Sequence, residues 1–404
     1  ANSKSYLSVP YYNVVSLNKD MTFTPRFYTD EKFLLQTEYR QVNKDSTQNS
    51  DFSLLKEKGK NSKSHFFYKV EKKLNFTKFD YSDLNLQIQK TSNNTYLKAN
   101  KLTSPLIENN EVLESSIDFN LSTDDLSVNS ELIVYEDLNK NNNSDKYEFI
   151  LPKVDIVKSL DNKTNLDGNF LFKSSNLIRN YQTNIFEKTN INDLTFSSNP
   201  KTTKSGFYNN YDFIIKNVNS DTQNSTDFKE NENYYLSGLI QLNSSLPLLK
   251  DGLNTQKILK PKMSLKMSPN NTKDISNKER RLDVNNIYNL NRLSTDTSVE
   301  GGISFVYGND FTIFDKNQSR EIFGLKLANN LRFEENDDLP KNNQIGSKTS
   351  NFFGEIEYSP SKFLTTKYNT SLKNNLSDIN YENFTTEINV NNFVTTFDYL
   401  NENN

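Results

Sequence analysis

The feature that most constrains the fold is a two-residue hydropathy rhythm that continues along almost the whole chain. Segments of roughly ten residues alternate apolar with polar side chains, and clusters of Asn, Asp, Lys and Ser separate them. Met263, Leu265 and Met267, for example, alternate with serine and lysine residues. Successive side chains of a β-strand point to opposite faces of the sheet. Each segment is therefore predicted to be a strand with one apolar face and one polar face.

The composition fits a large sheet that has water on one side. Only 34% of the 404 residues are hydrophobic, which is low for a chain that must fill a solid core. Aromatic residues nevertheless make up 12%, with 28 Phe and 21 Tyr, so the composition is not that of a disordered chain. A barrel with an aqueous lumen needs an apolar side chain at only every second position. We therefore predict an all-β fold, a large antiparallel transmembrane β-barrel.

The predicted strands follow one another with polar connections, some of them tight and others long. At about 20 residues per strand and connection, the chain is expected to hold roughly 18 to 21 strands. Each strand would be long enough to cross a bilayer at a tilt. The sequence contains no Pro-rich or Gly/Ser-rich linker, so we expect a single domain over residues 1–404. The main predicted strands are 6–17, 21–28, 33–42, 65–74, 84–88, 113–121, 126–135, 147–156, 168–181, 211–218, 234–242, 259–267, 302–307, 321–333, 352–358, 364–372 and 386–399, the last of which is compatible with one strand or with two.

Several classes of function find no support in the sequence. The chain has no cysteine, which excludes disulfides and thiolate metal sites, and its net charge of -3 gives no nucleic-acid footprint. It has no run of 18 apolar residues, and residues 1–4 show no apolar signal core. The single histidine, His65, is expected to be structural, because no spacing supports a Ser-His-Asp or zinc site around it. We therefore expect no enzyme activity, no metal and no organic cofactor.

The opening of the chain carries the most specific motif. Residues 9–28 read VPYYNVVSLNKDMTFTPRFY, and residues 34–40 read LLQTEYR. This pattern resembles the first three barrel strands of the LptD family, the lipopolysaccharide-assembly proteins of Gram-negative outer membranes. The family pattern there is a PYY segment, a TP segment and then an acidic residue before Arg-Tyr.

Two later segments resemble the same family, in the family's order. Residues 144–152, SDKYEFILP, are similar to its mid-barrel DRYEY.LP strand. The stretch from Leu259 through Arg292 and Glu300 to Gly308 is similar to a family strand followed by a D..NLF...R..G.DR.E.G.R..YG pattern. Residues 295–297, Thr-Asp-Thr, depart from the family's Gly-Asp-Arg, and the cysteines of some members are absent.

The resemblance implies an outer-membrane translocon that inserts lipopolysaccharide into the outer leaflet. In the family, the sugars pass through the lumen and the acyl chains leave through a lateral gate between the first and last strands. The implied partners are lipopolysaccharide, an LptE-like plug lipoprotein, an LptA-like periplasmic bridge and the barrel-assembly machinery. Members carry a periplasmic β-jellyroll before a 26-strand barrel. We therefore expect an incomplete barrel, without the jellyroll and without the last strands, since no aromatic residue ends the chain at Asn404.

The resemblance also implies a lateral gate at the start of the chain, formed by Pro10, Tyr11, Tyr12, Asn13 and Pro25. Two of these match the family's gate prolines, and a proline removes a donor from the strand ladder. The alternative is that the prolines mark strand ends. The alternation separately places a set of polar residues on the lumen face, where they would contact sugar hydroxyls and phosphates: Gln36, Arg40, Lys69, Lys73, Lys262, Lys266 and Lys326.

Other architectures and functions are compatible with the alternation. A series of β-sandwich domains should show composition breaks, and a β-solenoid should show a short fixed repeat, but the sequence shows neither. A diffusion porin or ligand-gated transporter would have a similar barrel. A secreted β-sandwich adhesin is a further alternative, and it would partition into water without detergent.

Overall fold

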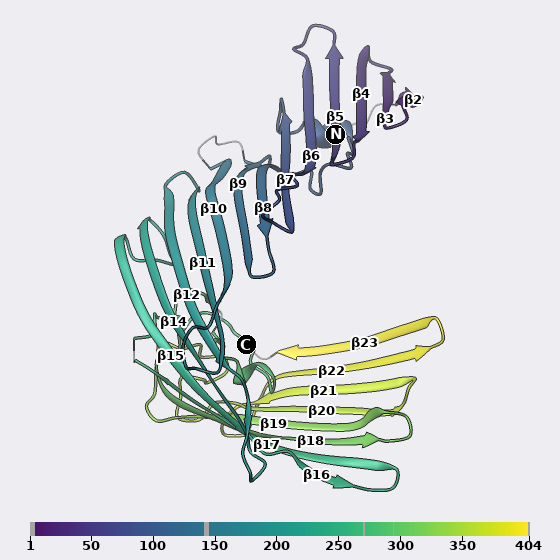
Figure 1. Cartoon of the computed structure of the whole chain (residues 1–404). Coiled ribbons are helices and arrows are strands. Elements are labelled where there is room, and N and C mark those ends of the chain that lie inside the picture. The colour runs from purple at the N-terminus through teal and green to yellow at the C-terminus, as the bar shows by residue number, and fades with distance from the viewer. Residues whose placement is uncertain (1–4, 141–144, 270, 294, 403–404) are drawn as a thin grey trace. The chain divides into compact units, whose positions relative to one another are not determined.

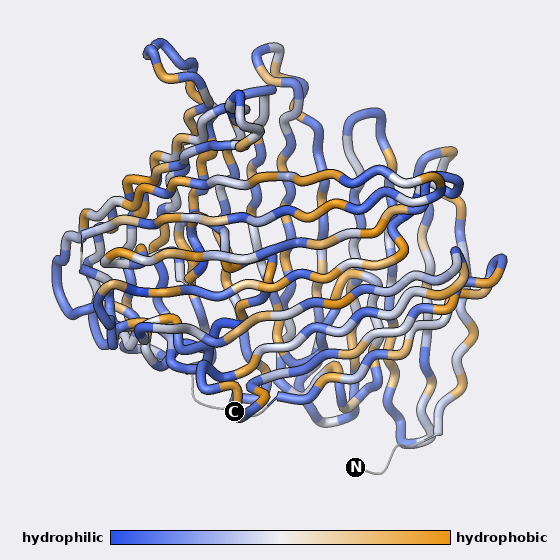
Figure 2. Tube along the Cα trace, turned by 90° about the horizontal axis from the view of Figure 1, so that it is seen from below, coloured by the Kyte–Doolittle hydropathy of each residue, from blue (hydrophilic) through white to orange (hydrophobic). Residues whose placement is uncertain are grey.

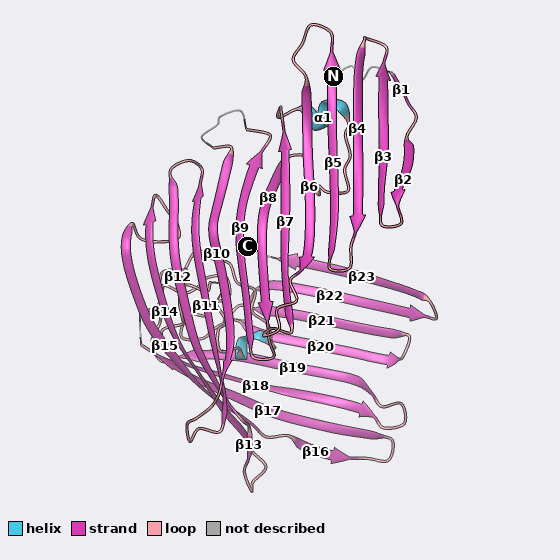
Figure 3. Cartoon of the chain, turned by 45° about the horizontal axis from the view of Figure 1, so that its top comes forward, coloured by secondary structure: helices cyan, strands magenta, loops and turns pink. Residues whose placement is uncertain are grey.

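The computed structural model describes residues 5–140, 145–269, 271–293 and 295–402 (Figure 1). Over these residues the protein has 23 strands in one sheet, one α-helix and one 3-10 helix, and strands form nearly all of its regular secondary structure (Figure 3). None of the helices within these ranges has the length and apolar character that a membrane span requires. The predictions for residues 1–4, Ser144 and Asn404 lie outside the described residues.

The chain forms two compact units, and each is described by itself. The first comprises Ala1–Ser159, Phe172–Asn192 and Asn219–Tyr234. It contains the helix α1 (Tyr96–Asn100). Its strands are β1 (Tyr6–Ser8), β2 (Tyr11–Ser16), β3 (Lys19–Tyr28), β4 (Lys32–Val42), β5 (Ser46–Glu57), β6 (Lys63–Lys73), β7 (Tyr81–Thr91), β8 (Val112–Ser122), β9 (Leu126–Asp137) and most of β10 (Tyr147–Leu160).

The second unit comprises Leu160–Leu171, Asp193–Val218 and Tyr235–Asn404. It contains the 3-10 helix η1 (Asn286–Tyr288). Its strands are β13 (Lys201–Thr202), β16 (Leu248–Asp251), β17 (Thr255–Ser268), β18 (Gly302–Asp315), β19 (Arg320–Arg332), β20 (Phe352–Ser361), β21 (Leu364–Leu372), β22 (Ile379–Val390) and β23 (Phe393–Glu402). Besides β10, four strands have residues in both units, namely β11 (Gly168–Tyr181), β12 (Ile185–Ser198), β14 (Tyr208–Gln223) and β15 (Asn231–Ser245).

The strands pair as an antiparallel meander. In the first unit, β3 to β10 each pair with the next strand along the chain, and in the second unit β17 to β23 do the same (Figure 1). Such connectivity arises because short polar turns return each strand directly to its neighbour. The predicted all-β antiparallel fold is therefore confirmed, and residues 386–399 do lie in two strands, β22 and β23.

The number of strands is higher than predicted because the structure contains short pieces as well as long strands. Three strands have four residues or fewer: β1, β13 and β16. The alternation was also too weak to predict two long strands, β5 and β12. Residues 46–53 of β5 are nearly all polar, so only one end of that strand shows the rhythm.

The alternation gives the sheet one apolar and one polar face, and it is visible along the strands as successive hydrophobic and hydrophilic segments (Figure 2). Large apolar side chains such as Phe52, Phe66, Ile117 and Leu327 are exposed on the apolar face rather than packed in a core. A sandwich would bury this face against a second sheet. Exposed apolar side chains over whole strands are instead typical of a surface that meets lipid.

Three loops fold onto the polar face, and the buried apolar clusters lie beneath them. In the first unit, residues 92–111 bring Tyr96, Leu97 and Leu102 against Leu34 and Phe67 of the sheet. In the second unit, two loops, residues 269–301 and 333–351, form the larger cluster. Its members are Ile275, Leu282, Val284, Ile287, Leu293, Val306, Ala328, Leu339, Ile345 and Phe353. The core of each unit is thus a contact between loops and sheet.

Candidate gate and polar face

The first long strand is interrupted at Val9 and Pro10, and Val9 stands opposite a second proline, Pro25, in the next strand. β1 and β2 both pair with β3, and the register is the same on either side of the break. That register places Val9 opposite Pro25 and Pro10 opposite Thr24. Pro25 lies inside β3, whereas Pro10 separates β1 from β2, so the predicted continuous strand over residues 6–17 is wrong at this point. The break falls there because Pro25, opposite Val9, has no N–H to donate to the ladder between the first strand and β3.

Two backbone hydrogen bonds fix the direction in which Pro25 faces. The Val42 N–H donates to the Asn18 carbonyl at 2.9 Å, and the Thr29 N–H donates to the Ser5 carbonyl at 3.4 Å. Since backbone groups of an antiparallel strand alternate sides, odd-numbered residues of β3 point toward the first strand. The Pro25 carbonyl does so, and it accepts a hydrogen bond of 2.8 Å from the Ser8 hydroxyl.

The two prolines therefore remove donors at different places. The missing donor of Pro25 leaves the Val9 carbonyl without its ladder partner, between the first strand and β3. Pro10 stands opposite Thr24, which points toward β4, so the missing donor of Pro10 lies on the side of the first strand away from β3. Both prolines weaken strand pairing, but they act on opposite sides of one strand.

The other three predicted gate residues lie in β2. Tyr11 and Asn13 stand opposite Phe23 and Met21, on the apolar face. Tyr12 lies on the polar face, where the guanidinium carbon of Arg40 is 6.0 Å from the centre of its ring. Tyr11 and Tyr12 are both exposed, so the first strand presents an aromatic side chain on each of its faces.

The predicted cations of the first unit lie on the polar face. Arg40 donates from Nε to Asp20 at 2.7 Å, and Lys69 pairs with Glu71 at 2.8 Å. Lys73 is exposed at the end of β6 and forms no ion pair among residues that the structure describes. A cavity of about 250 Å³ opens beside Arg40 and Lys69. Its other lining residues are Glu38, Tyr39, Thr47, Asn49, Ser50, Asp51, Glu71, Pro105 and Leu106.

Gln36 is on the polar face but is covered, so the prediction that it faces an open lumen is corrected. The 92–111 loop buries it, because its Nε2 donates to the Thr103 carbonyl at 3.0 Å and to Asp51 at 2.9 Å. Asp51 in turn lies 3.2 Å from Nε2 of His65. Gln36 therefore attaches the loop to the sheet.

The structure brings Ser53, Asp51 and His65 together, which the sequence analysis did not predict. The Ser53 hydroxyl lies 2.6 Å from Nδ1 of His65 and 2.8 Å from the hydroxyl of Tyr96. All four side chains are at most 1% exposed. A serine with no surface cannot meet a substrate, so this set is a buried hydrogen-bond network that holds α1 against the sheet. The strand register alone could have indicated it, since Ser53 and His65 are cross-strand partners.

Two of the predicted cations of the second unit, Lys262 and Lys326, form ion pairs with neighbouring carboxylates. Lys262 pairs with Asp310 at 2.8 Å, and its ammonium is 4.5 Å from the centre of the Tyr288 ring. Lys326 pairs with Glu355 at 2.7 Å. Both remain partly accessible on the polar face.

Lys266 is completely covered by the 269–301 loop, which corrects the prediction that it faces an open lumen. Its ammonium donates to the backbone carbonyls of Asn289 and Leu290. Only 1% of the residue is exposed. A charged group this deeply buried is stable only with such partners.

Beside Lys266 lies a buried ionic network that includes two residues of the third motif. Arg292 donates from Nε and Nη2 to the two carboxylate oxygens of Glu300, both at 2.7 Å, and Arg332 donates to Glu300 at 2.6 Å. Burial alone would raise the pKa of the Glu300 carboxyl. The positive charges of Arg292, Lys266 and Arg332 outweigh that effect and hold the pKa well below its ordinary value.

Within the described residues, no group of three or more His, Asp or Glu side chains is arranged to hold a metal ion.

A large antiparallel sheet with an exposed apolar face and a polar face covered by loops defines the class of outer-membrane β-barrel proteins. The model of the family described as LptD, LPS transport system D, matches residues 63–404. The chain therefore belongs to the LptD family, a family of transport proteins and not of enzymes. The match begins after the segment that holds Pro10 and Pro25.

The chain was also compared with solved structures and with curated proteins. Among solved structures, the alcaligin outer-membrane receptor FauA from Bordetella pertussis is similar at a TM-score of 0.31 and 8% identity, over 99% of this chain and 74% of the receptor. Similarity at that level carries no argument about function. The comparison with curated proteins finds no match.

Proposed function

We propose that this chain is the part of an outer-membrane translocon that inserts lipopolysaccharide into the outer leaflet. Its sugars would move along the polar face, and its acyl chains would leave at the edge of the first strand. The observation that carries the proposal is the interruption of that strand at Pro10, next to Val9, which stands opposite Pro25. A seam that must part repeatedly needs few backbone hydrogen bonds, each of which contributes about 0.5–1.5 kcal/mol.

The positions of the two prolines assign them different tasks in this mechanism. Pro10 removes a donor from the side of the first strand that would meet the last strand, so it lowers the strength of the seam itself. Pro25 loosens the first strand from β3, which would allow that strand to swing as the seam opens. Tyr11, Tyr12 and Asn13 would line the opening.

The polar contacts of the cargo are expected mainly in the first unit. There Arg40, Lys69 and Lys73 lie at or near the surface, and the first two border a cavity. Phosphate groups would pair with these cations as they pass, and weak contacts at several sites suit transport better than one tight site. Lys262 and Lys326 would contribute less, because their side chains are 18% and 32% exposed, against 46% for Arg40 and 40% for Lys69.

Partners of three kinds follow from this proposal. A periplasmic LptA-like bridge would deliver the lipopolysaccharide, and an LptE-like lipoprotein would occupy the polar side of the sheet. The barrel-assembly machinery would insert the chain. A lipoprotein in the second unit would meet the 269–301 and 333–351 loops before it could reach the sheet, since those loops already cover Lys266 and Val306.

The test is depletion of the chain in its source cell, followed by labelling of lipopolysaccharide at the cell surface. Complementation with Pro10→Ala, Pro25→Ala or both should slow delivery, and Pro261→Ala, a proline inside β17, is the matched control. Surface labelling that does not fall on depletion contradicts the translocon. Normal delivery by the double variant would leave the transport role intact but remove the gate role of the prolines. Steady sugar-selective conductance by the purified chain alone would favour a porin.

A further inference from the structure

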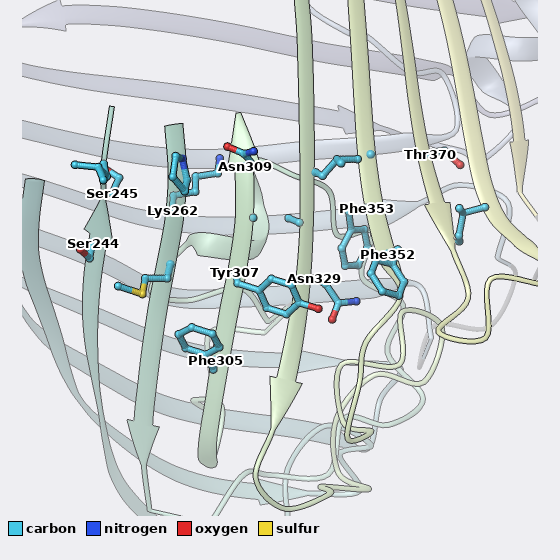
Figure 4. A pocket seen from close by; sticks show the side chains of 18 of the residues that line it. Ser244, Ser245, Lys262, Phe305, Tyr307, Asn309, Asn329, Phe352, Phe353 and Thr370 are labelled. Carbon is cyan, nitrogen blue, oxygen red and sulfur yellow. The ribbon is translucent and has the colours of Figure 1, made fainter. Parts of the chain in front are cut away.

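The apolar face of the second unit is hollowed by a groove of about 720 Å³ that runs from β15 to β21 (Figure 4). Its sides are formed by Phe305, Tyr307, Leu327 and Phe352. Gly354 contributes no side chain, and this leaves the floor open between Leu327 and Thr370. The surface of the apolar face is therefore concave here.

The register shows that the groove opens on the face that meets lipid. Tyr307 stands opposite Met263 on one side and opposite Asn329 on the other, and Leu327 stands opposite Gly354. Cross-strand partners share a face. Because Met263 and Leu327 are exposed members of the apolar face, the groove belongs to that face. Its occupant must therefore come from the membrane.

Two amide side chains give this apolar groove a specific chemistry. Asn329 is 1% exposed, and its Nδ2 donates to the carbonyls of Ser350 and Asn351, both at 3.0 Å. These two bonds fix the orientation of the amide, because a flip would set oxygen against oxygen. Its Oδ1 and the Oδ1 of Asn309 are both buried, and neither has a donor among the described residues.

Buried acceptors without donors are costly, and a ligand that supplies a donor removes that cost. The terminal torsion of an asparagine has a broad energy well, so the Asn309 oxygen can turn into the groove by a small rotation. The oxygen of Asn329 is held where it is. Asn309 is accordingly the adjustable acceptor, and its ligand must carry an N–H or O–H close to an apolar chain.

We propose that this groove binds one acyl lipid of the surrounding membrane whose chain is attached through a secondary amide. The chain would lie along Phe305 and Leu327, and the amide N–H would donate to Oδ1 of Asn309. An ester-linked chain of the same length fills the groove equally well but offers no donor. The groove volume is within the usual range for small-molecule sites, about 300–1,000 Å³. This inference does not depend on the gate at Pro10 and Pro25.

The absence of tryptophan from the chain gives a direct test. Phe305→Trp places the only tryptophan of the protein in the groove, and Phe66→Trp places it on an exposed site of the apolar face of the first unit. The full chain, folded in detergent micelles, is titrated with a brominated N-acyl amide lipid and with the ester analogue that carries the same brominated chain. Bromine quenches tryptophan fluorescence only at close range.

In Phe305→Trp, half-maximal quenching should require about three- to tenfold less amide lipid than ester lipid, the factor expected for one net hydrogen bond. The Phe66→Trp protein should not distinguish the two lipids. Adding Asn309→Leu to Phe305→Trp should abolish the preference while heat-modifiable migration on a gel shows that the barrel is folded.

Three outcomes would overturn the proposal. These are equal quenching by amide and ester at Phe305→Trp, an equal preference at Phe66→Trp, and a preference that survives Asn309→Leu. If Asn309→Leu fails to fold, Asn309→Val serves the same purpose, and the comparison of the two tryptophan sites remains decisive by itself.

Discussion

Arg292 and Glu300 form a two-point ion pair within the 269–301 loop, and Arg332 of β19 ties this pair to the sheet of the second unit. Both contacts are 2.7 Å long, and both side chains are at most 4% exposed. Arg332 of β19 adds a third contact to the same carboxylate. One carboxylate is thus the shared counter-charge of two buried guanidinium groups, and the loop that it holds covers Lys266.

Replacing Glu300 should release this loop. Glu300→Gln leaves Arg292 and Arg332 buried without a counter-charge, and removing one partner of such a pair costs about 3–5 kcal/mol. We expect the free energy of unfolding to fall by that amount in denaturant titrations, together with faster proteolysis between residues 269 and 301. Glu279→Gln, an exposed glutamate of the same loop, is the control and should change neither value. Unchanged proteolysis in Glu300→Gln would show that the apolar contacts of Ile287 and Leu293 hold the loop unaided.

The same carboxylate predicts how the loop responds to acid. Its pKa is lower in the folded protein than the ordinary value of 4.5, because the neighbouring Arg and Lys charges outweigh burial. A depressed pKa contributes stability above the unfolded value, and that stability is lost as the pH falls below it. Protection of residues 269–301 from hydrogen exchange should therefore be constant from pH 7 to about pH 5 and decline below about pH 4.5. A protein with Glu300→Gln should lose this acid dependence, and a loss of protection already at pH 6 would point to a different group.

Tyr96 should hold the 92–111 loop through one hydrogen bond and through the burial of its ring. Tyr96→Phe removes only the hydroxyl that meets Ser53 at 2.8 Å, so the expected loss is about 0.5–1.5 kcal/mol. Tyr96→Ala also removes the ring, and it should cost about 3–5 kcal/mol. Denaturant titration measures both values. Tyr234→Phe, at a tyrosine that is 73% exposed, is the matched control, and a loss there as large as at Tyr96 would contradict the assignment.

Replacing Gly308 by alanine should destabilise the protein, whereas the same replacement at Gly354 should have little effect on stability. A Cβ on Gly308 would collide with the Leu327 carbonyl and with the hydroxyl of Tyr288, which lies over the strand at this point. A Cβ on Gly354 meets Thr370 at 3.4 Å and Leu327 at 3.6 Å, which are ordinary contacts. Gly308→Ala is therefore expected to destabilise the protein by about 1–3 kcal/mol. Gly354→Ala should change the unfolding midpoint little, and equal effects in both variants would contradict the packing described here.

The sequence rhythm predicted the sheet well because every second side chain must suit one face, and this constraint acts on each strand separately. It failed where that constraint is weak, as over residues 46–53 of β5, where both faces are polar. The loops that cover Gln36 and Lys266 could not be predicted, because their contacts depend on backbone carbonyls such as those of Thr103 and Asn289. A backbone carbonyl has no signature in a sequence.

The candidate gate shows the same limit. The sequence motif predicted both Pro10 and Pro25 as gate residues. The side of the strand on which each proline lacks a backbone N–H, however, depends on the strand register. That register follows from bonds such as the one from the Val42 N–H to the Asn18 carbonyl, which no motif records. The positions of the prolines were predictable, and their opposite directions were not.

These opposite directions make a prediction about stability that separates the two prolines. Replacing either proline by alanine frees the unfolded backbone, which lowers the free energy of unfolding by about 0.4–1 kcal/mol. Pro25→Ala also supplies an N–H that points at the Val9 carbonyl, and one such ladder bond returns about 0.5–1.5 kcal/mol. Pro10→Ala gains no bond to β3, because its new N–H points the other way. Pro25→Ala should therefore be more stable than Pro10→Ala by about 0.5–1.5 kcal/mol in denaturant titrations, and hydrogen exchange should show a protected amide at position 25. A less stable Pro25→Ala, or rapid exchange at that amide, would show that the first strand and β3 are not in the register described here.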